Sequence, residues 1–375
     1  MKKKIVFLTG TRADFGKSKS LVEITSISDL FEVYIFATGM HMQEKYGNTV
    51  DEIEKCGFKN IYKFINYSSE ESMDKTLATT IQGFSNFIYG IRPDLIILHG
   101  DRIEALAGAI VGALNNILVA HIEGGEISGT VDELIRHSVS KLSHIHFVSN
   151  QSAKKRLIQM GEYENSIFII GSPDIDVMIS KKLPTIQEAK ERYEINYKDY
   201  AILMFHPVTT ENCKMQEYSR ELVDAVTKSC HNYIVIYPNN DIGSHFIFEE
   251  YNRFTNNPKF KIFPSIRFEY FLVFLKNANF IIGNSSAGIR EAPYYGIPVI
   301  NVGTRQQNRS LHADIINCGH NKNEIINAIK KAENAEFESV ELYGNGSSNK
   351  LFLEIITTDE FWRKNHQKQF NDLNY

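Results

Sequence analysis

Short apolar segments recur along the whole chain, and each is almost continuously hydrophobic instead of alternating with polar residues. A strand that is buried on both faces has this pattern, as in a parallel sheet covered by helices. The sequence therefore predicts buried strands at 5–8, 33–37, 95–98, 117–120, 145–148, 167–170, 201–205, 233–237, 261–263, 280–282 and 299–302.

Most stretches between these strands are long enough for a helix. The clearest helical segments are 132–142, 186–193, 217–230 and 322–332. Strands that alternate with helices are typical of βαβ units and of a doubly wound parallel sheet. We therefore expect an α/β protein.

The run of strands pauses between about 171 and 196, where two prolines and a charged stretch lie. We read this pause as the linker between two Rossmann-like domains that face each other across a cleft. The predicted N-terminal domain covers 1–172 and the predicted C-terminal domain covers 173–357. Thr358-Asp359-Glu360 has the pattern of a cap, which predicts a last helix at about 358–375.

Composition narrows the class of protein. The 375 residues are 43% hydrophobic and 23% charged, as in an ordinary globular protein. A formal net charge of −4 argues against a nucleic-acid partner. No stretch approaches the ~20 apolar residues of a membrane helix. The 4 cysteines have no C-x-x-C spacing, which argues against a zinc site and fits a reducing cytoplasm.

Polar or small residues follow nearly every predicted strand. In open parallel sheets, ligands bind at the carboxyl ends of the strands. We therefore expect a ligand site in the cleft, with side chains from both halves of the chain. The residues placed at these ends are Arg12, His41, Asp101, Arg102, Glu123, His206, Asn239, Ser285, Ser286 and Arg305.

The segment Gly283-Asn284-Ser285-Ser286 precedes an expected helix that contains Glu291. Backbone N–H groups at a helix N-terminus, beside serine hydroxyls, suit a phosphate or diphosphate. Simple capping of the helix by this segment is the alternative. Arg12 and Arg305 favour an anion site. Glu291 could accept two sugar hydroxyls, such as those of a ribose, or could be an ordinary first-turn charge.

Three carboxylates could supply proton chemistry. Asp101 and Glu123 follow buried strands, and Asp132 lies at the start of the helix that carries Arg136. Burial and neighbouring charges can hold such acids in different protonation states. This set could remove a proton from one face of a carbon and return one to the other. The structural alternatives are that Asp132 caps its helix and that Asp101 pairs with Arg102 or Arg136.

Other features also have competing interpretations. His206 is either structural or close to the phosphate groups, and Phe271 either belongs to the core or covers a nucleobase. Segment 10–18 nearly matches a P-loop, but five residues stand where the motif has four, so a kinase or ATPase is disfavoured. Asp174-Ile175-Asp176 is similar to the metal-binding D-x-D of some glycosyltransferases, although a helix N-terminus is favoured. We predict no metal.

In these segments, the chain resembles the hydrolysing UDP-N-acetylglucosamine 2-epimerases that supply sialic acid synthesis. The non-hydrolysing epimerases share the fold but differ after the HIE-like segment, where this chain has GGEISGTVDELIRH. The shared segments span nearly the whole chain and are GTRADFGK, YGNT, RPDLIILHGDRIEALA, HIEGGEISGTVDELIRHSVSKLSHIHF, GSPDID, FHPVT, YPNNDIGS, IIGNSSAGIREAPYYGIPVINVGTRQ and YGNGSS.

The resemblance implies a glycosyltransferase-B-like fold, a C-terminal helix that packs back on the first domain, no cofactor, and a homodimer or homotetramer. It implies a UDP-sugar substrate and UDP product. One departure is Gly16, where some relatives have a serine, so a hydroxyl contact is absent or comes from Ser18. The implied acid/base residues are Asp101, Glu123 and Asp132, with His206 near the diphosphate. The implied UDP residues are Arg12, Asn239, Phe271, Ser285, Ser286, Glu291 and Arg305. The implied residues at the sugar side, or behind it, are His41, Arg102 and Arg136.

The implied reaction converts UDP-N-acetylglucosamine and water into N-acetylmannosamine and UDP. It proceeds by anti elimination through a 2-acetamidoglucal, followed by hydration. One alternative is the same reaction on UDP-2,4-diacetamido-2,4,6-trideoxyglucose, in the legionaminic acid pathway. A glycosyltransferase of the same fold and a non-catalytic nucleotide-sugar sensor are the others.

Overall fold

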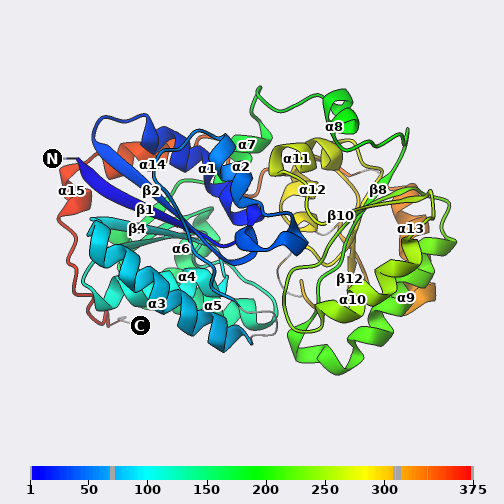
Figure 1. The fold of residues 1–375 in the computed structure, drawn as a ribbon, viewed down its shortest axis with the longest axis horizontal. Coiled ribbons are helices and arrows are strands. Elements are labelled where there is room, and N and C mark those ends of the chain that lie inside the picture. The colour runs from blue at the N-terminus through cyan, green and yellow to red at the C-terminus, as the bar shows by residue number, and fades with distance from the viewer. Residues whose placement is uncertain (1, 68–71, 307–308, 310–313, 336, 373–375) are drawn as a thin grey trace. The chain divides into compact units, whose positions relative to one another are not determined.

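The computed structural model describes residues 2–67, 72–306, 309, 314–335 and 337–372. The chain forms two compact units (Figure 1). Unit 1 contains Met1–Glu126, Asp132–Ser180 and Tyr343–Tyr375, and unit 2 contains Ile127–Val131 and Lys181–Leu342.

Unit 1 is built on a seven-stranded parallel sheet with the order β3-β2-β1-β4-β5-β6-β7. Strand order reverses between β1 and β4, which is the switch point where open α/β sheets bind ligands. The strands are β1 (Lys3–Thr9), β2 (Phe31–Ala37), β3 (Ile61–Lys63), β4 (Leu95–His99), β5 (Leu118–Ile122), β6 (Ile145–Val148) and β7 (Ile167–Ile169).

Helices cover both faces of this sheet (Figure 1). Helices α1, α7 and α14 pack on one another on one face, and α3 packs on α4 on the other. The helices of unit 1 are α1 (Arg12–Ser26), α2 (Val50–Lys55), α3 (Met73–Ile91), α4 (Ile103–Leu114), α5 (Thr130–Leu142), α6 (Gln151–Gln159), α7 (Pro173–Met178), α14 (Ser348–Ile356) and α15 (Asp359–Trp362).

Unit 2 repeats this plan with a six-stranded parallel sheet in the order β10-β9-β8-β11-β12-β13. Its switch point lies between β8 and β11. The strands are β8 (Ala201–Met204), β9 (Tyr233–Ile236), β10 (Phe260–Phe263), β11 (Ile281–Gly283), β12 (Val299–Val302) and β13 (Ile316–Cys318). The helices are α8 (Ile186–Arg192), α9 (Met215–Lys228), α10 (Ser244–Tyr251), α11 (Phe268–Lys276), α12 (Glu291–Tyr294) and α13 (Lys322–Glu333).

The predicted fold class is confirmed, and every predicted strand is present within a few residues. The sequence analysis missed β3 and β13. Both are three-residue strands at the edges of their sheets, and both are partly exposed, so neither has the continuous apolar pattern of a buried strand.

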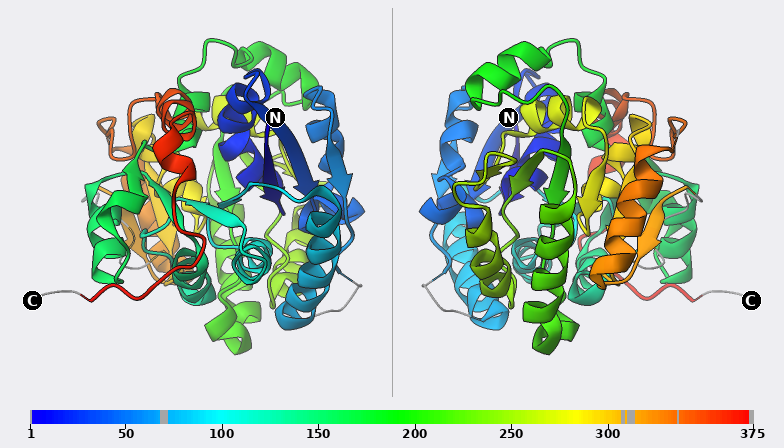
Figure 2. Two further views of the ribbon diagram at one scale, coloured as in Figure 1. Left: turned by 90° about the vertical axis from the view of Figure 1, so that its left-hand side faces the viewer. Right: turned by 90° about the vertical axis from the view of Figure 1, so that its right-hand side faces the viewer.

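The predicted C-terminal helix at 358–375 is wrong beyond Trp362, where α15 ends. The next residues run along unit 1 without helix, as the red segment of Figure 2 shows. Hydrogen bonds to unit 1 take the place of helical ones: the carbonyl of His366 contacts the His144 ring at 2.8 Å, and the carbonyl of Phe370 accepts from Tyr163 at 3.3 Å.

The chain passes between the units at 180 and 343, whereas these points were predicted at 172 and 357. It also enters unit 2 briefly at Ile127–Val131, a segment that was predicted to belong to the N-terminal domain. Helix α7 stays with unit 1 because it packs on α1 and α14. Asp176 in α7 accepts hydrogen bonds from the backbone N–H groups of Ser348 and Asn349, both at 2.8 Å. This carboxylate therefore anchors the start of α14 to unit 1.

Candidate active site

Arg136 brings two of the predicted acid/base residues together in unit 1. Its side chain is buried on α5, donates to the Asp101 carboxylate, and donates to the backbone carbonyl of Glu123 at 2.6 Å. Asp101 lies just after β4 and Glu123 just after β5, which are neighbours in the sheet. The alternative that Asp101 pairs with Arg136 is thus confirmed, and the pairing fixes the orientation of this carboxylate.

Glu123 has a strained backbone and a fixed side chain. Its φ of 64° lies in the left-handed region, which is unfavourable for a residue with a side chain. One carboxylate oxygen accepts from the Ser172 hydroxyl, and the other lies 3.3 Å from Nε2 of His99. Strain of about 1–3 kcal/mol of this kind gathers at functional sites, where the surroundings enforce it.

Asp132 lies in the first turn of α5 and is buried. It precedes Arg136 by four residues, so the two side chains share a face of the helix. The structure therefore places Asp132 one turn from the guanidinium that contacts Asp101 and Glu123. A carboxylate in the first turn also complements the positive end of the helix dipole.

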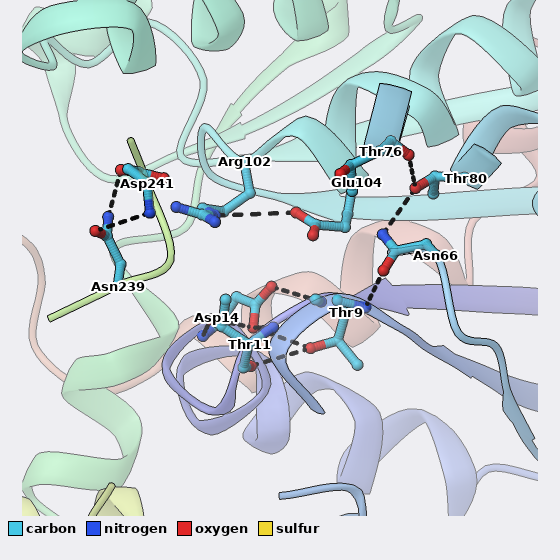
Figure 3. A network of polar contacts seen from close by, with 12 residues as sticks. Thr9, Thr11, Asp14, Asn66, Thr76, Thr80, Arg102, Glu104, Asn239 and Asp241 are labelled. Carbon is cyan, nitrogen blue, oxygen red and sulfur yellow. Dashed lines mark hydrogen bonds and ion pairs between the residues drawn. The ribbon is translucent and has the colours of Figure 1, made fainter. Parts of the chain in front are cut away.

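The turn between β1 and α1 is held by Asp14 (Figure 3). Its carboxylate accepts from the backbone N–H groups of Gly10, Thr11 and Phe15 at 2.8–2.9 Å and from two threonine hydroxyls. This network places Arg12, a predicted UDP residue, at the first position of α1. Asp14 was not among the predicted site residues, because it belongs to no recognised motif and its hydrogen bonds to nearby backbone groups form only in the folded turn.

His41 and Arg102 differ in how they could meet a ligand. The His41 ring is fully buried between the hydroxyls of Thr9 and Thr49, at 3.0 and 2.8 Å, and burial lowers its pKa to about 4. The His41 side chain therefore lies beneath the surface formed by the strand ends and is not exposed to a ligand there. Arg102 precedes α4, and its Nε lies 3.9 Å from a carboxylate oxygen of Glu104.

Asn284 organises the strand ends of unit 2. Its side-chain oxygen accepts from the backbone N–H of His206 at 2.7 Å, and its amide donates to the His206 carbonyl at 2.8 Å. Its own carbonyl accepts from Arg305 at 3.2 Å and from Gln306 at 2.8 Å. The Asn284 side chain thus holds the end of β8, and its backbone carbonyl holds the segment after β12.

His206 has a defined tautomer. Its Nδ1 accepts a hydrogen bond from the backbone N–H of Asn239 at 3.0 Å. A neutral imidazole that accepts at Nδ1 carries its proton on Nε2, which is then a donor. The Asn239 side chain is held in turn by Asp241 (Figure 3).

The helix that was expected after Ser286, with Glu291 inside it, is not continuous. Ser285 caps a single 3-10 turn at Ser286–Gly288 by accepting from the backbone N–H of Ala287 at 3.3 Å. Glu291 begins a separate helix of four residues, α12, and is buried. The chain breaks here because Pro293 lies within α12 and cannot donate to a preceding carbonyl.

The remaining predicted residues of unit 2 have clear positions. Phe271 is buried in α11, within the aromatic run expected in the core. Arg305 is almost fully buried, with its guanidinium on the Asn284 carbonyl.

The two near-motifs have structural roles. Lys17, from the segment that nearly matches a P-loop, is buried and lies 3.5 Å from Asp174. Asp176 accepts from the Ser20 hydroxyl at 2.9 Å and anchors α14. Both aspartates of the D-x-D segment therefore make polar contacts within unit 1. Among the residues that the structure describes, no group of three or more His, Cys, Asp or Glu side chains could hold a metal ion.

Sequence comparison identifies the family. A family model described as UDP-N-acetylglucosamine 2-epimerase matches residues 25–357. The chain belongs to the UDP-N-acetylglucosamine 2-epimerase family. The resemblance drawn from the motifs is thereby confirmed, and this epimerase family member is an enzyme.

Three relatives of this epimerase family member cover almost the whole chain. A UDP-N-acetylglucosamine 2-epimerase of Neisseria meningitidis serogroup B is 49% identical over 99% of this chain and 100% of its own. A hydrolysing UDP-N,N'-diacetylbacillosamine 2-epimerase of Legionella pneumophila is 34% identical over 96% of both chains. Polysialic acid biosynthesis protein P7 of Escherichia coli is 35% identical over 94% of this chain and 91% of its own.

The fold is that of solved epimerases. The UDP-GlcNAc 2-epimerase of Methanocaldococcus jannaschii, solved in complex with UDP-GlcNAc and UDP, has a TM-score of 0.80 and 21% identity. The match covers 94% of this chain and 99% of that one. None of the helices in the described part of this epimerase family member is long and apolar enough to cross a lipid bilayer.

Proposed function

We propose that the protein is a hydrolysing UDP-N-acetylglucosamine 2-epimerase that forms N-acetylmannosamine and UDP for sialic acid biosynthesis. The observation that carries this proposal is the group in which the buried Arg136 holds the partly exposed Asp101 and the backbone of the buried Glu123, with Asp132 one turn away. The 49% identical relative bears the name of this activity, and the relative from Escherichia coli bears a name from polysialic acid synthesis.

The chemistry needs two proton transfers on opposite faces of carbon 2. A carboxylate removes the carbon-2 proton while the bond from carbon 1 to the UDP oxygen breaks. The electron pair of that carbon–oxygen bond leaves with the diphosphate, and the pair of the carbon–hydrogen bond moves between carbons 1 and 2. A double bond between carbons 1 and 2 results, which is the 2-acetamidoglucal. Water then adds its hydroxyl to carbon 1, and a proton enters carbon 2 from the other face. Positioned acids and bases typically contribute ~10²–10⁴-fold to each such step.

Unit 1 supplies the carboxylates for these transfers. Arg136 and Ser172 fix the orientations of Asp101 and Glu123, which is what a proton transfer over hydrogen-bond distance requires. The strained backbone of Glu123 supports the same assignment, since the fold maintains an unfavourable conformation at this residue.

Unit 2 supplies the groups for the departing UDP. The Nε2–H donor of His206 and the guanidinium of Arg305 suit the negative charge that grows on the diphosphate as it leaves. Ser285, Ser286, Asn239, Phe271 and Glu291 remain the predicted contacts to the rest of UDP, together with Arg12 from unit 1.

Incubation of the protein with UDP-N-acetylglucosamine and no acceptor tests the proposal. Proton NMR should show N-acetylmannosamine and UDP appearing in equal amounts, and Asp101→Asn should abolish both. Stable UDP-N-acetylglucosamine would contradict the proposed reaction. UDP release that requires an added acceptor would instead indicate a glycosyltransferase.

A second substrate deserves the same assay, because the Legionella pneumophila relative bears the name of a diacetylbacillosamine epimerase. UDP-2,4-diacetamido-2,4,6-trideoxyglucose differs from UDP-N-acetylglucosamine at carbons 4 and 6. We expect the larger kcat/KM with UDP-N-acetylglucosamine. The reverse order would assign the protein to the legionaminic acid pathway.

We also propose that the enzyme works in the cytoplasm as a homodimer or homotetramer, as the family resemblance implies. Light scattering on the purified protein tests the assembly, with a monomer mass of 42.9 kDa as the result that would contradict it. Cell fractionation with activity measured in each fraction tests the location.

A further inference from the structure

Glu104 is a buried carboxyl group at the switch point of unit 1, and no step above uses it. It lies in the first turn of α4, directly after the segment that carries Asp101 and Arg102, and only 2% of it is exposed. Placing a carboxylate here is unfavourable unless its charge and its oxygens are satisfied. Its neighbours therefore indicate what it does.

Two glycines shape the space for this carboxyl group. A Cβ atom on Gly10, after β1, would lie 2.7 Å from Cδ of Glu104. A Cβ atom on Gly39, after β2, would lie 2.5 Å from its Oε1. Gly39 also has a φ of +62°, which favours glycine. The backbones that follow β1 and β2 thus lie so close to the carboxyl group that a side chain at Gly10 or Gly39 would require it to move.

Asn66 lies on one side of Glu104 (Figure 3). A side-chain hydrogen bond of Asn66 lowers the pKa of the Glu104 carboxyl group, and Asn66 also accepts from the backbone N–H of Gly39 at 3.0 Å. The Asn66 amide donates to Thr80 at 2.8 Å, and Thr80 donates to the carbonyl of Thr76 at 2.7 Å. This chain of bonds fixes the Asn66 amide and hence the side of Glu104 that faces it.

Arg102 holds Glu104 from the other side, with 3.9 Å between Nε and Oε2 (Figure 3). Asp14, from α1, also acts on Glu104 through its charge. The pKa of Glu104 is raised overall, because burial raises it and Asp14 adds to this, whereas Arg102, the backbone N–H of Glu104 and Asn66 lower it. The guanidinium is therefore the main group that favours the carboxylate in this apolar setting.

We propose that Glu104 is a positioning residue, which orients the guanidinium of Arg102 toward the sugar side of the substrate from a seat formed by Gly10, Gly39 and Asn66. This proposal rests on the proposed function, in which Arg102 belongs to the sugar side. A carboxylate that is fixed on its far side can hold a guanidinium at one angle, whereas a mobile carboxylate cannot.

A double-mutant cycle tests whether Glu104 acts through Arg102. The proteins are wild type, Glu104→Gln, Arg102→Met and the double variant, with kcat and KM measured for UDP release. We expect each single change to lower kcat/KM by about tenfold or more, mainly through KM, as expected for a lost substrate contact. The double variant should be no worse than Arg102→Met. Losses that multiply in the double variant would show that Glu104 acts independently and would overturn the proposal.

A matched control separates positioning from stability. Glu162 is a buried glutamate of the same unit that pairs with His146, and Glu162→Gln should lower the melting temperature while leaving KM unchanged. A Glu104→Gln variant that loses stability but keeps the wild-type KM would overturn the positioning role. If Glu104→Gln fails to fold, Asn66→Ala removes one bond to the carboxylate and should raise KM in the same direction.

The experiment distinguishes a failure of the role proposed for Glu104 from a failure of the proposed function. Turnover by wild type with an uncoupled cycle contradicts only the role of Glu104. Absence of turnover with either nucleotide sugar contradicts the proposed function. The cycle is then measured on the dissociation constant for UDP-N-acetylglucosamine by calorimetry, and absence of coupling there overturns the positioning role as well.

Discussion

Replacing Glu162 by glutamine should lower the free energy of unfolding of unit 1. The Glu162 carboxylate is buried, accepts from Lys141 at the end of α5 at 3.0 Å and from His146 at 3.0 Å, and pairs with Lys368. The Lys368 ammonium also donates to the carbonyls of Lys141 and Ser143 at 2.8 and 2.7 Å. One buried carboxylate therefore fixes the C-terminal turn of α5.

The size of the effect follows from the pKa of Glu162, which is lowered from 4.5 to about 2. Burial acts in the opposite direction, but the hydrogen bond and charge of His146 and the charge of Lys368 outweigh it. Burial also lowers the pKa of His146, so at pH 7 this ring supplies a hydrogen bond but no charge. At about 1.4 kcal/mol for each pKa unit, the upper bound is about 3.5 kcal/mol. The neutral His146 ring and the solvent screening of the partly exposed Lys141 reduce this bound, and we expect about 2 kcal/mol at pH 7.

The pH dependence has a definite sign. The pKa of Glu162 is lower in the folded protein than in the unfolded chain, so the carboxylate stabilises the fold fully above about pH 4.5. That contribution is lost as the pH falls toward about 2. Glutamine lacks the titration, so the free energies of unfolding of wild type and Glu162→Gln should converge at low pH.

Urea unfolding followed by tryptophan fluorescence measures this difference. The chain has 1 tryptophan, Trp362, which lies in unit 1 and therefore reports the unfolding of that unit. The control is Glu354→Gln, an exposed carboxylate on α14 that should change stability by less than about 0.5 kcal/mol. A Glu162→Gln effect that is equally large at pH 7 and pH 3, or that is absent at pH 7, would refute the reasoning.

Three further predictions concern the candidate site. Arg136→Met should lower kcat by about 100-fold or more in the UDP-release assay, because it leaves Asp101 without the cation that orients it, and an unchanged kcat would contradict the assignment. Asn284→Ala should weaken UDP binding by about tenfold in calorimetry, since it removes both side-chain hydrogen bonds that hold the His206 backbone. Gly283→Ala should lower the melting temperature and destabilise unit 2 by about 2 kcal/mol or more, because φ is +134° there and a Cβ atom would lie 1.9 Å from the carbonyl oxygen of Met204.

The sheet of each unit was predictable because a strand buried on both faces has a local signature. The strands that were missed, β3 and β13, are short edge strands whose pairing depends on distant segments. Helix α15 likewise ends where side chains such as Lys368 find partners on α5, more than 220 residues earlier in the chain. Such distant partners cannot be predicted from the local sequence.

The site was predictable to the extent that it follows strand ends. Asp101 and Glu123 lie where the expected strands end, and the structure joins them through Arg136. Asn284 was interpreted as a possible helix cap, yet it links three strand ends through long-range hydrogen bonds. Glu104 was not identified because its role depends on Gly10, Gly39 and Asn66, which are brought together only by folding.

The central claim, that carboxylates of unit 1 invert carbon 2 as UDP departs, is tested most directly in deuterium oxide. Mass spectrometry of the N-acetylmannosamine formed there should find one solvent deuteron bound to carbon 2 in every product molecule. N-acetylmannosamine that keeps the original hydrogen at carbon 2 would contradict the elimination and hydration described above.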